Sequence, residues 1–518
     1  MTDSAYELPW SEICLYSVNQ IRAIESSALS SQSNPGLMQK AGYAAALCAQ
    51  ELISNANEPV LVIAGPGNNG GDAFETAFKL SQSGVLTTVI QYGVTDSYSA
   101  DAKACLFRAK KSGVTFMDKD RLPELLTQDW SLIIDGLFGI GLQQRASNAD
   151  ILQIIQTINA FSSKTNIPVL ALDVPSGLNA DTGQPVSGDQ IIVRATHTIT
   201  FIGNKPGLHT GCGKDVAGKV SVNNLDIKSS YYPRPTIFLN SQQTIPTPEP
   251  RQHNSHKGSY GDVIIAGGAQ GMSGAVVLAA RAALYTGAGR VFAGFLHSAT
   301  QYDSQHPELM CRNAHELDFC SASVVVGPGL GQSAEAIELL RNILSTAKKM
   351  VIDADALNLI ALHLDLQILL KNSSAFKILT PHPLEAARLM NVSTETIQND
   401  RLRYAKLLAE KLHATVILKG SGSIIADPDG SIFINTTGNP ALATGGTGDV
   451  LAGVCGTLLE QSATSTIAAQ ISCWIHGHAA DVIVQKGTGP IGITASELIP
   501  EIRNGLNNLT RQTPNKII

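Results

Sequence analysis

Charged and aromatic side chains are scarce in this sequence, and no basic cluster stands out. Charged residues make up 15% and aromatic residues 5% of the 518 positions, and the formal net charge is -6. No run of lysine or arginine longer than that in "AKK" lies near an aromatic cluster, so the chain offers no basic field to a polyanion. We therefore expect no nucleic acid among its partners.

Long apolar segments and paired cysteines are missing as well. The N-terminus, "MTDSAYELPWSEICLYS", has early acidic residues and no apolar signal segment. Arg281 interrupts the apolar stretch "GAVVLAARAALYTGAG". The eight cysteines form no CxxC pair and lie mostly in apolar contexts, which indicates buried thiols in a reducing compartment. We expect a cytoplasmic protein with no membrane partner.

The chain is long enough for two domains, and a change in composition indicates where they divide. Hydrophobic residues make up 44% of the sequence, enough for one large core or two ordinary ones. Between Tyr231 and Ser259, five prolines in a polar setting separate two stretches of strand and helix alternation. We place the boundary near residue 240 and predict domains at 1–240 and 241–518.

Apolar runs in both halves end in turns that contain glycine or aspartate. Examples are "VLVIAGPGNNGGD", "SLIIDGLFGIG" and "VLALDVPSG" in the first half, and "SVVVGPGLGQ" and "MVIDADALN" in the second. Helical stretches lie between many of them, which predicts βαβ units and parallel sheets whose carboxyl-end loops carry the ligand sites. The predicted fold class is α/β, with two domains that are not an internal repeat. "SIIADPDGSIFIN" predicts a β-hairpin.

The stretch "GPGNNGGD" joins a predicted strand to a helix expected to begin near Asp72. That helix would direct its positive end at a ligand, and the loop glycines let backbone amides approach closely. The loop lacks the Lys-Ser/Thr of a Walker loop, and Asn68 and Asn69 replace the small spacers of GxGxxG. It predicts a polar or anionic ligand, although a tight turn would also explain it taken alone.

Polar residues follow two more predicted strands of the first half. Asp135 in "IIDGLFGIG" and Asp173 in "LALDVPSG" stand at strand ends, so a parallel sheet would bring them to one rim with Asn69. Amide, carboxylate and hydroxyl oxygens, including that of Ser176, suit a monovalent or hard divalent cation and not zinc. For either aspartate alone a helix cap or turn is the alternative. Together with the asparagines they favour a site.

The motifs "GPGNNGGD", "DGLFGIGL", "DVPSGLNADTG" and "HTITFIGNKPGL", after "GLMQKAG", resemble those of the NAD(P)H-hydrate epimerases over Tyr16 to Asn224. The resemblance implies a Rossmann-like three-layer αβα sandwich, with Asp173 as acid/base group. Gln39 and Lys40 depart from the family's usual Glu-Arg. The implied potassium ligands are Asn69, Asp135 and Ser176. The implied substrate contacts are Asn68, Asn69, Gly70, Gly71, Asp72, Gly139, Ile140, Gly141, Leu142, Gln143, Gln144, Arg145 and Asp173.

The second half contains "NPALATGGTGDVLAGV", in which bare amides at a predicted helix N-terminus face Asp449. An anion hole beside a carboxylate suits phosphoryl transfer, although a Gly-rich helix cap is the alternative. "KGSGS", at 419–423, offers a cation and small-residue amides to a nucleotide phosphate. His382 stands in a proline-bounded turn, where a structural role is the commoner one. His476 and His478 are read as packing or surface residues.

This half resembles the ADP/ATP-dependent NAD(P)H-hydrate dehydratases, which have a ribokinase-like αβα fold. The motifs are "HKGSYGDVIIAGGAQGMSGA", "VVVGPGLG", "DADALN", "TPHPLEA", "KGSGS" and "GNPALATGGTGDVLAG", over His256 to Leu498. The resemblance makes Asp449 the base. Its implied substrate contacts are Ala275, Gly329, Gly331, His382 and Asp449. Its implied nucleotide contacts are Lys419, Gly420, Ser421, Gly422, Ser423 and Gly448.

Together the two resemblances imply a repair enzyme for hydrated nicotinamide cofactors. The first domain would interconvert R- and S-NAD(P)HX, and the second would dehydrate the S epimer with ADP and Mg²⁺, giving AMP and phosphate. We expect potassium in the first domain and a homo-oligomer. One alternative is a ribokinase-like kinase for a vitamin precursor. Another is a first domain that only binds a ligand or partner.

Overall fold

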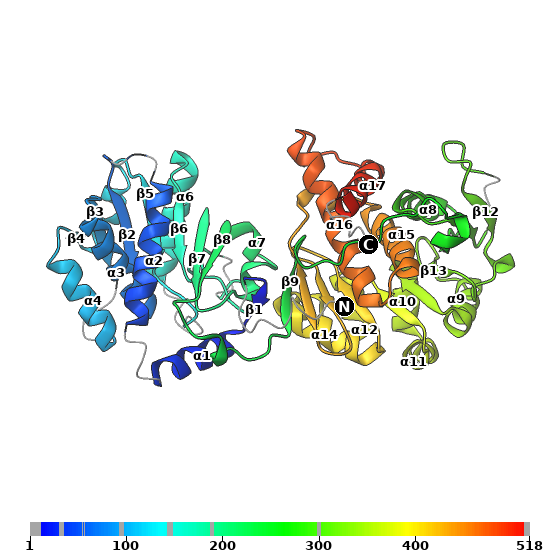
Figure 1. Cartoon of the computed structure of the whole chain (residues 1–518), viewed down its shortest axis with the longest axis horizontal. Coiled ribbons are helices and arrows are strands. Elements are labelled where there is room, and N and C mark those ends of the chain that lie inside the picture. Colours follow the sequence, from blue (N-terminus) through cyan, green and yellow to red (C-terminus); the bar gives the residue numbers. More distant parts are fainter. Residues whose placement is uncertain are drawn as a thin grey trace. The chain divides into compact units, whose positions relative to one another are not determined.

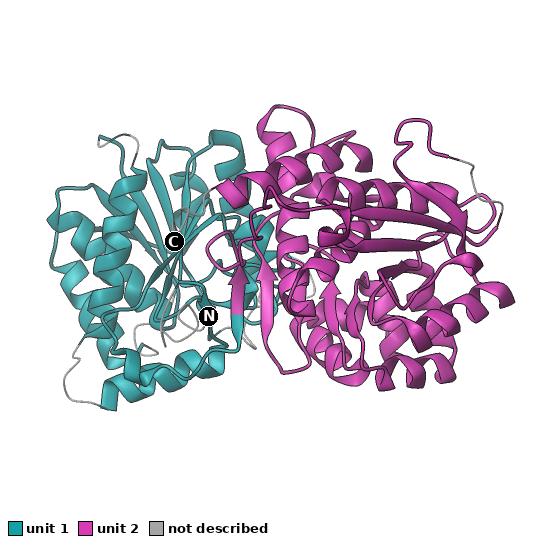
Figure 2. Ribbon diagram, turned by 45° about the vertical axis from the view of Figure 1, so that its right-hand side comes forward, with its two compact units in different colours: residues 1–237 teal, residues 238–518 magenta. Residues whose placement is uncertain are grey.

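The computed structural model describes residues 12–30, 36–53, 55, 57–92, 98–141, 149–186, 191–297 and 302–511. The chain divides into two compact units, Met1–Ile237 and Phe238–Ile518, coloured teal and magenta in Figure 2. Both are α/β units built around a sheet that is largely or wholly parallel. Across the described residues, no helix combines the length and the apolar character that a membrane crossing requires.

The first unit has a parallel sheet in the order β4-β3-β2-β5-β6-β7-β8. The strands are β2 (Val60–Ala64), β3 (Thr87–Gln91), β4 (Thr115–Met117), β5 (Leu132–Gly136), β6 (Val169–Leu172), β7 (His197–Phe201) and β8 (Lys219–Asn223). β1 (Cys14–Leu15) lies beside Asn204. β3 and β4 extend the sheet on one side of β2, and β5 to β8 extend it on the other side. The strand order therefore reverses between β2 and β5.

Helices cover both faces of this sheet. α2 (Leu37–Leu52), α3 (Asn68–Gln82) and α4 (Ala100–Lys110) pack together on one face (Figure 1). α5 (Leu122–Leu125) and α6 (Ala149–Thr165) share a core cluster with Leu61 and Ile63, on the other face. All five residues of β2 are buried because helices cover both faces of the sheet, and all five are therefore apolar. α1 (Val18–Ser30) and α7 (Gly213–Val216) complete the unit.

The second unit has the sheet order β9-β18-β17-β16-β15-β14-β13-β10-β11-β12. β9 (Ile237–Asn240), β10 (Asp262–Gly267), β11 (Arg290–Phe295), β12 (Met310–Asn313) and β13 (Ser323–Val326) come first in the chain. β14 (Lys349–Ile352), β15 (Phe376–Leu379), β16 (Thr415–Leu418), β17 (Ile424–Ala426) and β18 (Ile432–Asn435) follow. Strands β10 to β16 pair in parallel, whereas β17 and β18 form the predicted hairpin, which is confirmed.

The helices of the second unit form two layers on the sheet (Figure 1). α8 (Ser273–Thr286), α15 (Thr447–Gln461), α16 (Ser465–Gln485) and α17 (Ala495–Arg511) pack against one another on one face. On the other lie α9 (Ala334–Thr346), α10 (Ala354–Leu362), α11 (Leu364–Asn372), α12 (Pro383–Met390), α13 (Thr394–Asn399) and α14 (Arg401–Leu412).

Candidate functional site

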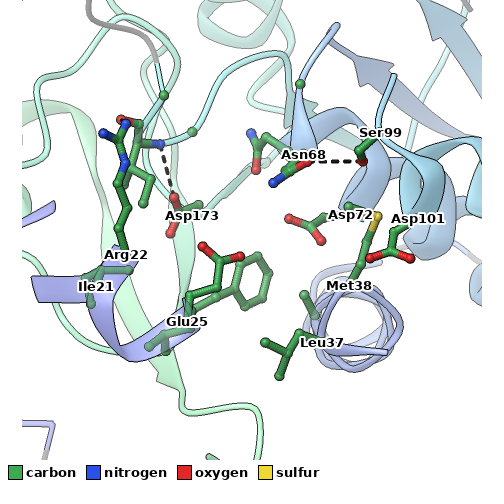
Figure 3. Close-up of a pocket in the computed structure, with 18 of the residues that line it drawn as sticks. Ile21, Arg22, Glu25, Leu37, Met38, Asn68, Asp72, Ser99, Asp101 and Asp173 are labelled. Carbon is green, nitrogen blue, oxygen red and sulfur yellow. Dashed lines mark hydrogen bonds between the residues drawn. The ribbon is translucent and has the colours of Figure 1, made fainter. Parts of the chain in front are cut away.

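The first unit contains a cavity of about 810 Å³ at the carboxyl ends of its strands. It lies where the strand order reverses, which is where open α/β sheets bind ligands. The loops after β2, β5 and β6 form part of its wall, and α1 and α2 supply another part (Figure 3). Its polar wall residues are Arg22, Glu25, Asn68, Asn69, Asp72, Ser99, Asp101 and Asp173.

The glycines of the loop after β2 have different roles. A Cβ atom on Gly65 would lie 1.7 Å from the Leu137 carbonyl oxygen, and one on Gly70 would lie 1.9 Å from the Gly65 carbonyl oxygen. These two glycines let backbone segments pack together. Gly67 lines the cavity, and no described atom lies within 4 Å of its Cβ position. α3 begins at Asn68, so the predicted helix start near Asp72 is wrong by about one turn.

Asp173 is fixed at the cavity by donors from separate segments. Its Oδ1 lies 2.7 Å from Lys205 Nζ, whose side chain is 1% exposed. Its Oδ2 accepts the Ile140 N–H at 3.2 Å, and Thr200 Oγ1 donates to Oδ1 at 3.4 Å. The backbone of Asp173 is left-handed, with φ 65, a conformation that a non-glycine residue keeps only when its surroundings enforce it. The carboxylate is therefore held in one place, beside a buried cation.

Asp135 and Ser176 form a buried pair below the loop after β5. The Ser176 hydroxyl donates to Asp135 Oδ1 at 2.6 Å, and the Ser176 N–H donates to Oδ2 at 2.8 Å. Burial raises the pKa of Asp135 to about 6, although the hydrogen bonds from Ser176 act in the opposite direction. The Phe138 N–H donates to Ser176 Oγ at 3.0 Å, so this pair also anchors the loop that follows β5.

Asn69 carries a buried amide that no group in the described structure binds. The residue is 6% exposed, and neither Oδ1 nor Nδ2 makes a hydrogen bond. A Cβ atom on Gly139 would lie 3.5 Å from Asn69 Cγ and 2.9 Å from Asp173 Oδ2, so the Gly139 backbone lies beside both. An unsatisfied buried polar group costs about 1–3 kcal/mol. The amide is therefore available to a ligand or an ion.

Two more carboxyl groups point into the cavity, near Asp173 (Figure 3). Burial raises the pKa of Glu25, and the negative charge of Asp173 raises it further. Burial also raises the pKa of Asp72 well above its usual range, with added contributions from Asp173 and Glu25. Asp72 is among the substrate contacts that the resemblance implies, whereas Glu25 was not predicted from the sequence. The sequence feature that could have indicated Glu25 is its position on α1, on the same helical face as Ile21 four residues earlier.

The other residues that the epimerase resemblance assigned fall into three groups. Gly139, Ile140 and Gly141 line the cavity, and Asn68 Oδ1 accepts the Ser99 hydroxyl at 3.3 Å. Gly71 packs against Met38, whose Sδ lies 2.4 Å from its Cβ position, and neither Gly70 nor Gly71 belongs to the described cavity wall. Leu142, Gln143, Gln144 and Arg145 lie outside the described residues.

Lys40, where the sequence departs from the epimerase pattern, has its own partners. Lys40 Nζ donates to the Leu225 carbonyl at 3.1 Å and lies 3.2 Å from Asp226 Oδ2. Leu225 is part of the cavity wall. Lys40 therefore supports the wall from behind.

In the second unit, Asp449 stands in the first turn of α15. The helix begins after Gly446, which has a left-handed φ of 91, and no side chain caps its N-terminus within the described structure. The Thr447 N–H donates to the Thr444 carbonyl, so the amides that α15 offers to an anion are those of Gly448 and Asp449. Burial raises the pKa of Asp449 to about 6, and the charge of Asp353 adds to this effect.

Asp353, directly after β14, and Lys419, directly after β16, form an ion pair. Lys419 Nζ lies 2.8 Å from Asp353 Oδ1, which also accepts the Thr380 hydroxyl at 2.7 Å. A Cβ atom on Gly448 would lie 3.5 Å from Lys419 Nζ and 4.0 Å from Asp353 Oδ2. The start of α15, the end of β14 and the end of β16 therefore meet. Asp353 belongs to the motif "DADALN", but no role was predicted for it from the sequence.

The loop Lys419–Ser423 lies on a buried arginine. Arg401 is 2% exposed, and its Nη2 donates to the carbonyls of Leu418 and Lys419 at 3.3 and 3.4 Å. Its Nε has no hydrogen-bond partner in the described structure, and burial lowers the pKa of the guanidinium to about 10. A Cβ atom on Gly420 would lie 2.1 Å from Arg401 Nη1. Gly420 also has a positive φ of 143, which residues with a side chain rarely adopt.

His382 caps a helix, which is the structural role weighed from the sequence. Its Nδ1 accepts the N–H groups of Leu384 and Glu385 at 3.2 Å each, and Glu385 Oε2 accepts the His382 N–H at 2.8 Å. This capping box starts α12. Burial raises the pKa of Glu385 to about 7. His382 Nε2 lies 3.3 Å from Glu385 Oε1. A contact of His382 with substrate stays a prediction.

The remaining predicted substrate contacts lie on, or directly after, two loops that are hydrogen-bonded to each other. Gly329 and Gly331 have left-handed φ values of 58 and 74, and the Gly331 N–H donates to Asp355 Oδ2 at 2.9 Å. The Ala269 N–H donates to the Gly329 carbonyl at 2.6 Å, which joins the loop after β10 to the loop after β13. Ala275 lies in the first turn of α8, which begins after the same loop.

His476 and His478 are both packing residues, in agreement with the reading from the sequence. His478 stacks on Trp474, with ring centroids 4.6 Å apart. His476 is buried, and its Nε2 lies 2.9 Å from the Thr447 carbonyl oxygen. Burial lowers the pKa of His476 to about 4, so the neutral ring donates its Nε2–H to that carbonyl. His476 therefore fixes the first turn of α15.

Two protein-family models match the chain, one in each unit. Residues 35–207 match the family described as YjeF-related protein N-terminus. Residues 263–504 match the family described as NAD(P)H-hydrate dehydratase. The first match includes the loops after β2, β5 and β6, and the second includes Asp353, Lys419 and Asp449.

Curated proteins resemble the chain over nearly its whole length. The chain is 36% identical over 502 residues to the bifunctional NAD(P)H-hydrate repair enzyme Nnr of Coxiella burnetii, covering 94% of this chain and 98% of the relative. It is 35% identical over 484 residues to the protein of that name from Escherichia coli, covering 91% and 89%. A solved structure, the ADP/ATP-dependent NAD(P)H-hydrate dehydratase from Bacillus subtilis co-crystallised with ATP/Mg²⁺, is 27% identical. It covers 52% of this chain and 98% of that chain, with a TM-score of 0.46.

Proposed function

The chain belongs to the bifunctional NAD(P)H-hydrate repair enzymes, and from this membership we propose how its two units share the work. The enzyme restores nicotinamide cofactors that have taken up water. The first unit, with the predicted bounds 1–240, interconverts R- and S-NAD(P)HX. The second, with the predicted bounds 241–518, dehydrates the S epimer to NAD(P)H with ADP, giving AMP and phosphate.

The fixed carboxylate of Asp173 is the observation that carries the epimerase assignment. Epimerisation inverts the ring carbon that bears the hydroxyl, and this requires a proton to leave the hydroxyl and return. Lys205 stabilises the charged form of Asp173 from below, and Ile140 N–H orients its second oxygen toward the cavity. The carboxylate can therefore accept the hydroxyl proton of a ring seated in the cavity.

Potassium is the cation that we propose for this unit. The oxygen donors nearby are the amide of Asn69, the carboxylate of Asp135 and the hydroxyl of Ser176, a set that suits a hard cation of low charge. The unpartnered amide of Asn69 fits such an ion, as it has no other acceptor or donor in the described structure. When bound, potassium would fix the loop after β5 and offset negative charge near the cofactor's phosphates.

The dehydratase assignment follows from Asp449 at the open N-terminus of α15. Asp449 takes the proton of the ring hydroxyl as that oxygen attacks the terminal phosphorus of ADP, and AMP leaves. The first amides of α15 and the ammonium of Lys419 stabilise charge on the transferred phosphoryl group. Phosphate then leaves the ring with the electron pair of the carbon–oxygen bond, assisted by the ring nitrogen, and a ring proton is lost. We expect Mg²⁺ to enter with the nucleotide.

A mixture of the two NADHX epimers, supplied with ADP and Mg²⁺, tests both assignments. The return of dihydronicotinamide absorbance should account for both epimers. Consumption of the S epimer alone by folded protein would refute the epimerase assignment, and consumption of neither would refute both. Vitamin precursors serve as the comparison, since efficient phosphorylation of one of them would favour a vitamin-precursor kinase. The cytoplasmic location and the homo-oligomer stay predictions.

A further inference from the structure

Helix α1 brings an acid to the cavity from outside the matched part of the family. Ile21, Arg22, Glu25 and Leu29 of α1 line the wall, whereas the family match begins at residue 35. The Glu25 carboxyl points toward Asp173 in Figure 3. Within the described structure it makes no hydrogen bond and no ion pair. Its oxygens are thus available to whatever occupies the cavity.

Glu25 and Asp173 are two carboxyl groups in different environments. Asp173 has an ammonium at 2.7 Å and a backbone N–H at 3.2 Å, which stabilise its ionised form. Glu25 lacks such donors, and burial followed by the charge of Asp173 raises its pKa. A carboxylate paired with an ammonium can serve as the base, and a neighbouring carboxyl group without such donors can serve as the acid.

The cavity also shows an independent sign of a ligand. The amide of Asn69, which is 6% exposed, lines the same wall and has no partner in the described structure. A buried amide of this kind is normally paired with protein, water or an ion. The two acids therefore share a wall with an amide that is open to a bound group, for which potassium is proposed above.

We propose that Glu25 is a second catalytic residue of the epimerase, which gives a proton to the ring nitrogen while Asp173 takes the proton of the ring hydroxyl. This inference rests on the proposed epimerase function. The carbon–nitrogen bond breaks, its electron pair stays on nitrogen, and the hydroxyl carbon becomes an aldehyde. The aldehyde then turns its other face, the bond closes again, and both protons return. Nothing is oxidised, and no co-reactant is consumed.

Asp72 is less suited to this role, although it faces the same space. Burial, the charge of Asp173 and the charge of Glu25 all raise the pKa of Asp72. For Glu25, the charges of Arg22 and Lys205 lower the pKa in opposition to burial and Asp173. A proton donor works best when its pKa lies near the working pH. Two cations, Arg22 and Lys205, thus act on Glu25, whereas burial holds the pKa of Asp72 well above its usual range.

The test uses the full chain with purified R-NADHX and no nucleotide, and follows the S epimer by chromatography above the uncatalysed rate. We expect Glu25→Gln to lower kcat by about 100-fold or more, with KM changed by less than about threefold. Glu25→Asp should recover part of kcat. The basic limb of the pH profile, where the donor loses its proton, should be missing in Glu25→Gln. Glu51→Gln, on an exposed position of α2, is the matched control and should match the wild type.

The possible outcomes distinguish failure of the Glu25 proposal from failure of the proposed epimerase function. If the wild type does not form S-NADHX, the proposed epimerase function fails. If the wild type is active and Glu25→Gln keeps kcat within about threefold, or raises only KM, the catalytic role of Glu25 is overturned. Dehydration of S-NADHX with ADP, measured on every variant, reports that the chain is folded and should not change.

Discussion

Lys205 Nζ and Asp173 Oδ1 lie 2.7 Å apart, and their side chains are 1% and 13% exposed. The ammonium of Lys205 also donates to Thr200 Oγ1 at 2.6 Å and to the Phe201 carbonyl at 3.0 Å. A buried cation with several acceptors is held in one position. It fixes both the charge and the direction of the carboxylate at the cavity.

Lys205→Met should therefore weaken epimerisation without touching the second unit. We expect a fall in kcat for R-NADHX of about 100-fold, because Asp173 loses the cation that stabilises its ionised form. Removing one partner of a buried ion pair also costs about 3–5 kcal/mol in the free energy of unfolding. Epimerisation assays and thermal unfolding measure the two effects.

The exposed Lys219 of β8 provides the control, as Lys219→Met removes a lysine from the same unit without touching Asp173. It should leave epimerisation unchanged. A Lys205→Met variant that folds and epimerises at the wild-type rate would contradict the proposed role of the pair.

Asp449→Asn and Asp173→Asn should give different losses. Asp449→Asn removes the proposed base for phosphoryl transfer, so we expect neither epimer to be repaired. Asp173→Asn should stop repair of the R epimer alone, since S-NADHX enters the second unit directly. Absorbance assays on each separate epimer distinguish the two. Equal losses on both epimers in Asp173→Asn would show that the mutation acts on the whole chain instead.

Much of the fold could be predicted because strands buried on both faces leave a clear pattern. All five residues of β2, Val60 to Ala64, are buried, and the sequence shows an uninterrupted apolar run there. The order of the strands had no such local signal, as the same runs fit several sheet orders. The start of α3 was also misplaced, because Asn68 begins the helix without a side-chain cap.

Residues of the candidate sites could be predicted only where they belong to a recognisable sequence motif. Asp173 and Asp449 stand in recognisable turns after or before regular elements. Glu25 and Arg401 reach their sites from helices outside the recognised motifs, and neither belongs to a glycine-rich stretch. Side-chain pairing across such distances depends on packing, which local patterns do not contain.

The rate of dehydration should depend on the protonation of Asp449. Burial raises its pKa to about 6, and a base must be ionised to accept a proton. As pH falls through about 6, Asp449 becomes protonated, and kcat/KM for S-NADHX should fall toward about tenfold per pH unit. Above that pH the profile should be flat. Calorimetric binding of ADP at each pH separates this effect from titration of the nucleotide, and a rate that stays constant down to pH 5 would contradict the role.

Potassium should affect the first unit selectively. Replacing it with N-methylglucamine should lower epimerisation of R-NADHX and leave dehydration of S-NADHX unchanged. Potassium at 100 times its Kd should also add about 2.7 kcal/mol to the free energy of unfolding of this unit. Asn69→Ala removes the unpartnered amide and should abolish both responses. Equal responses in the wild type and the variant would place the ion elsewhere.

Arg401 should control how tightly the second unit binds nucleotide. Its guanidinium supports the carbonyls of Leu418 and Lys419 from below, and its Nε has no partner within the described structure. We expect Arg401→Met to raise the Kd for ADP about tenfold, equivalent to about 1.4 kcal/mol, because the loop loses both its support and a positive charge. The exposed neighbour Arg403 gives the control, and Arg403→Met should bind ADP as the wild type does. Calorimetry measures both, and unfolding by denaturant confirms that Arg401→Met is folded. An unchanged Kd in folded Arg401→Met would mean that the buried charge serves the fold alone.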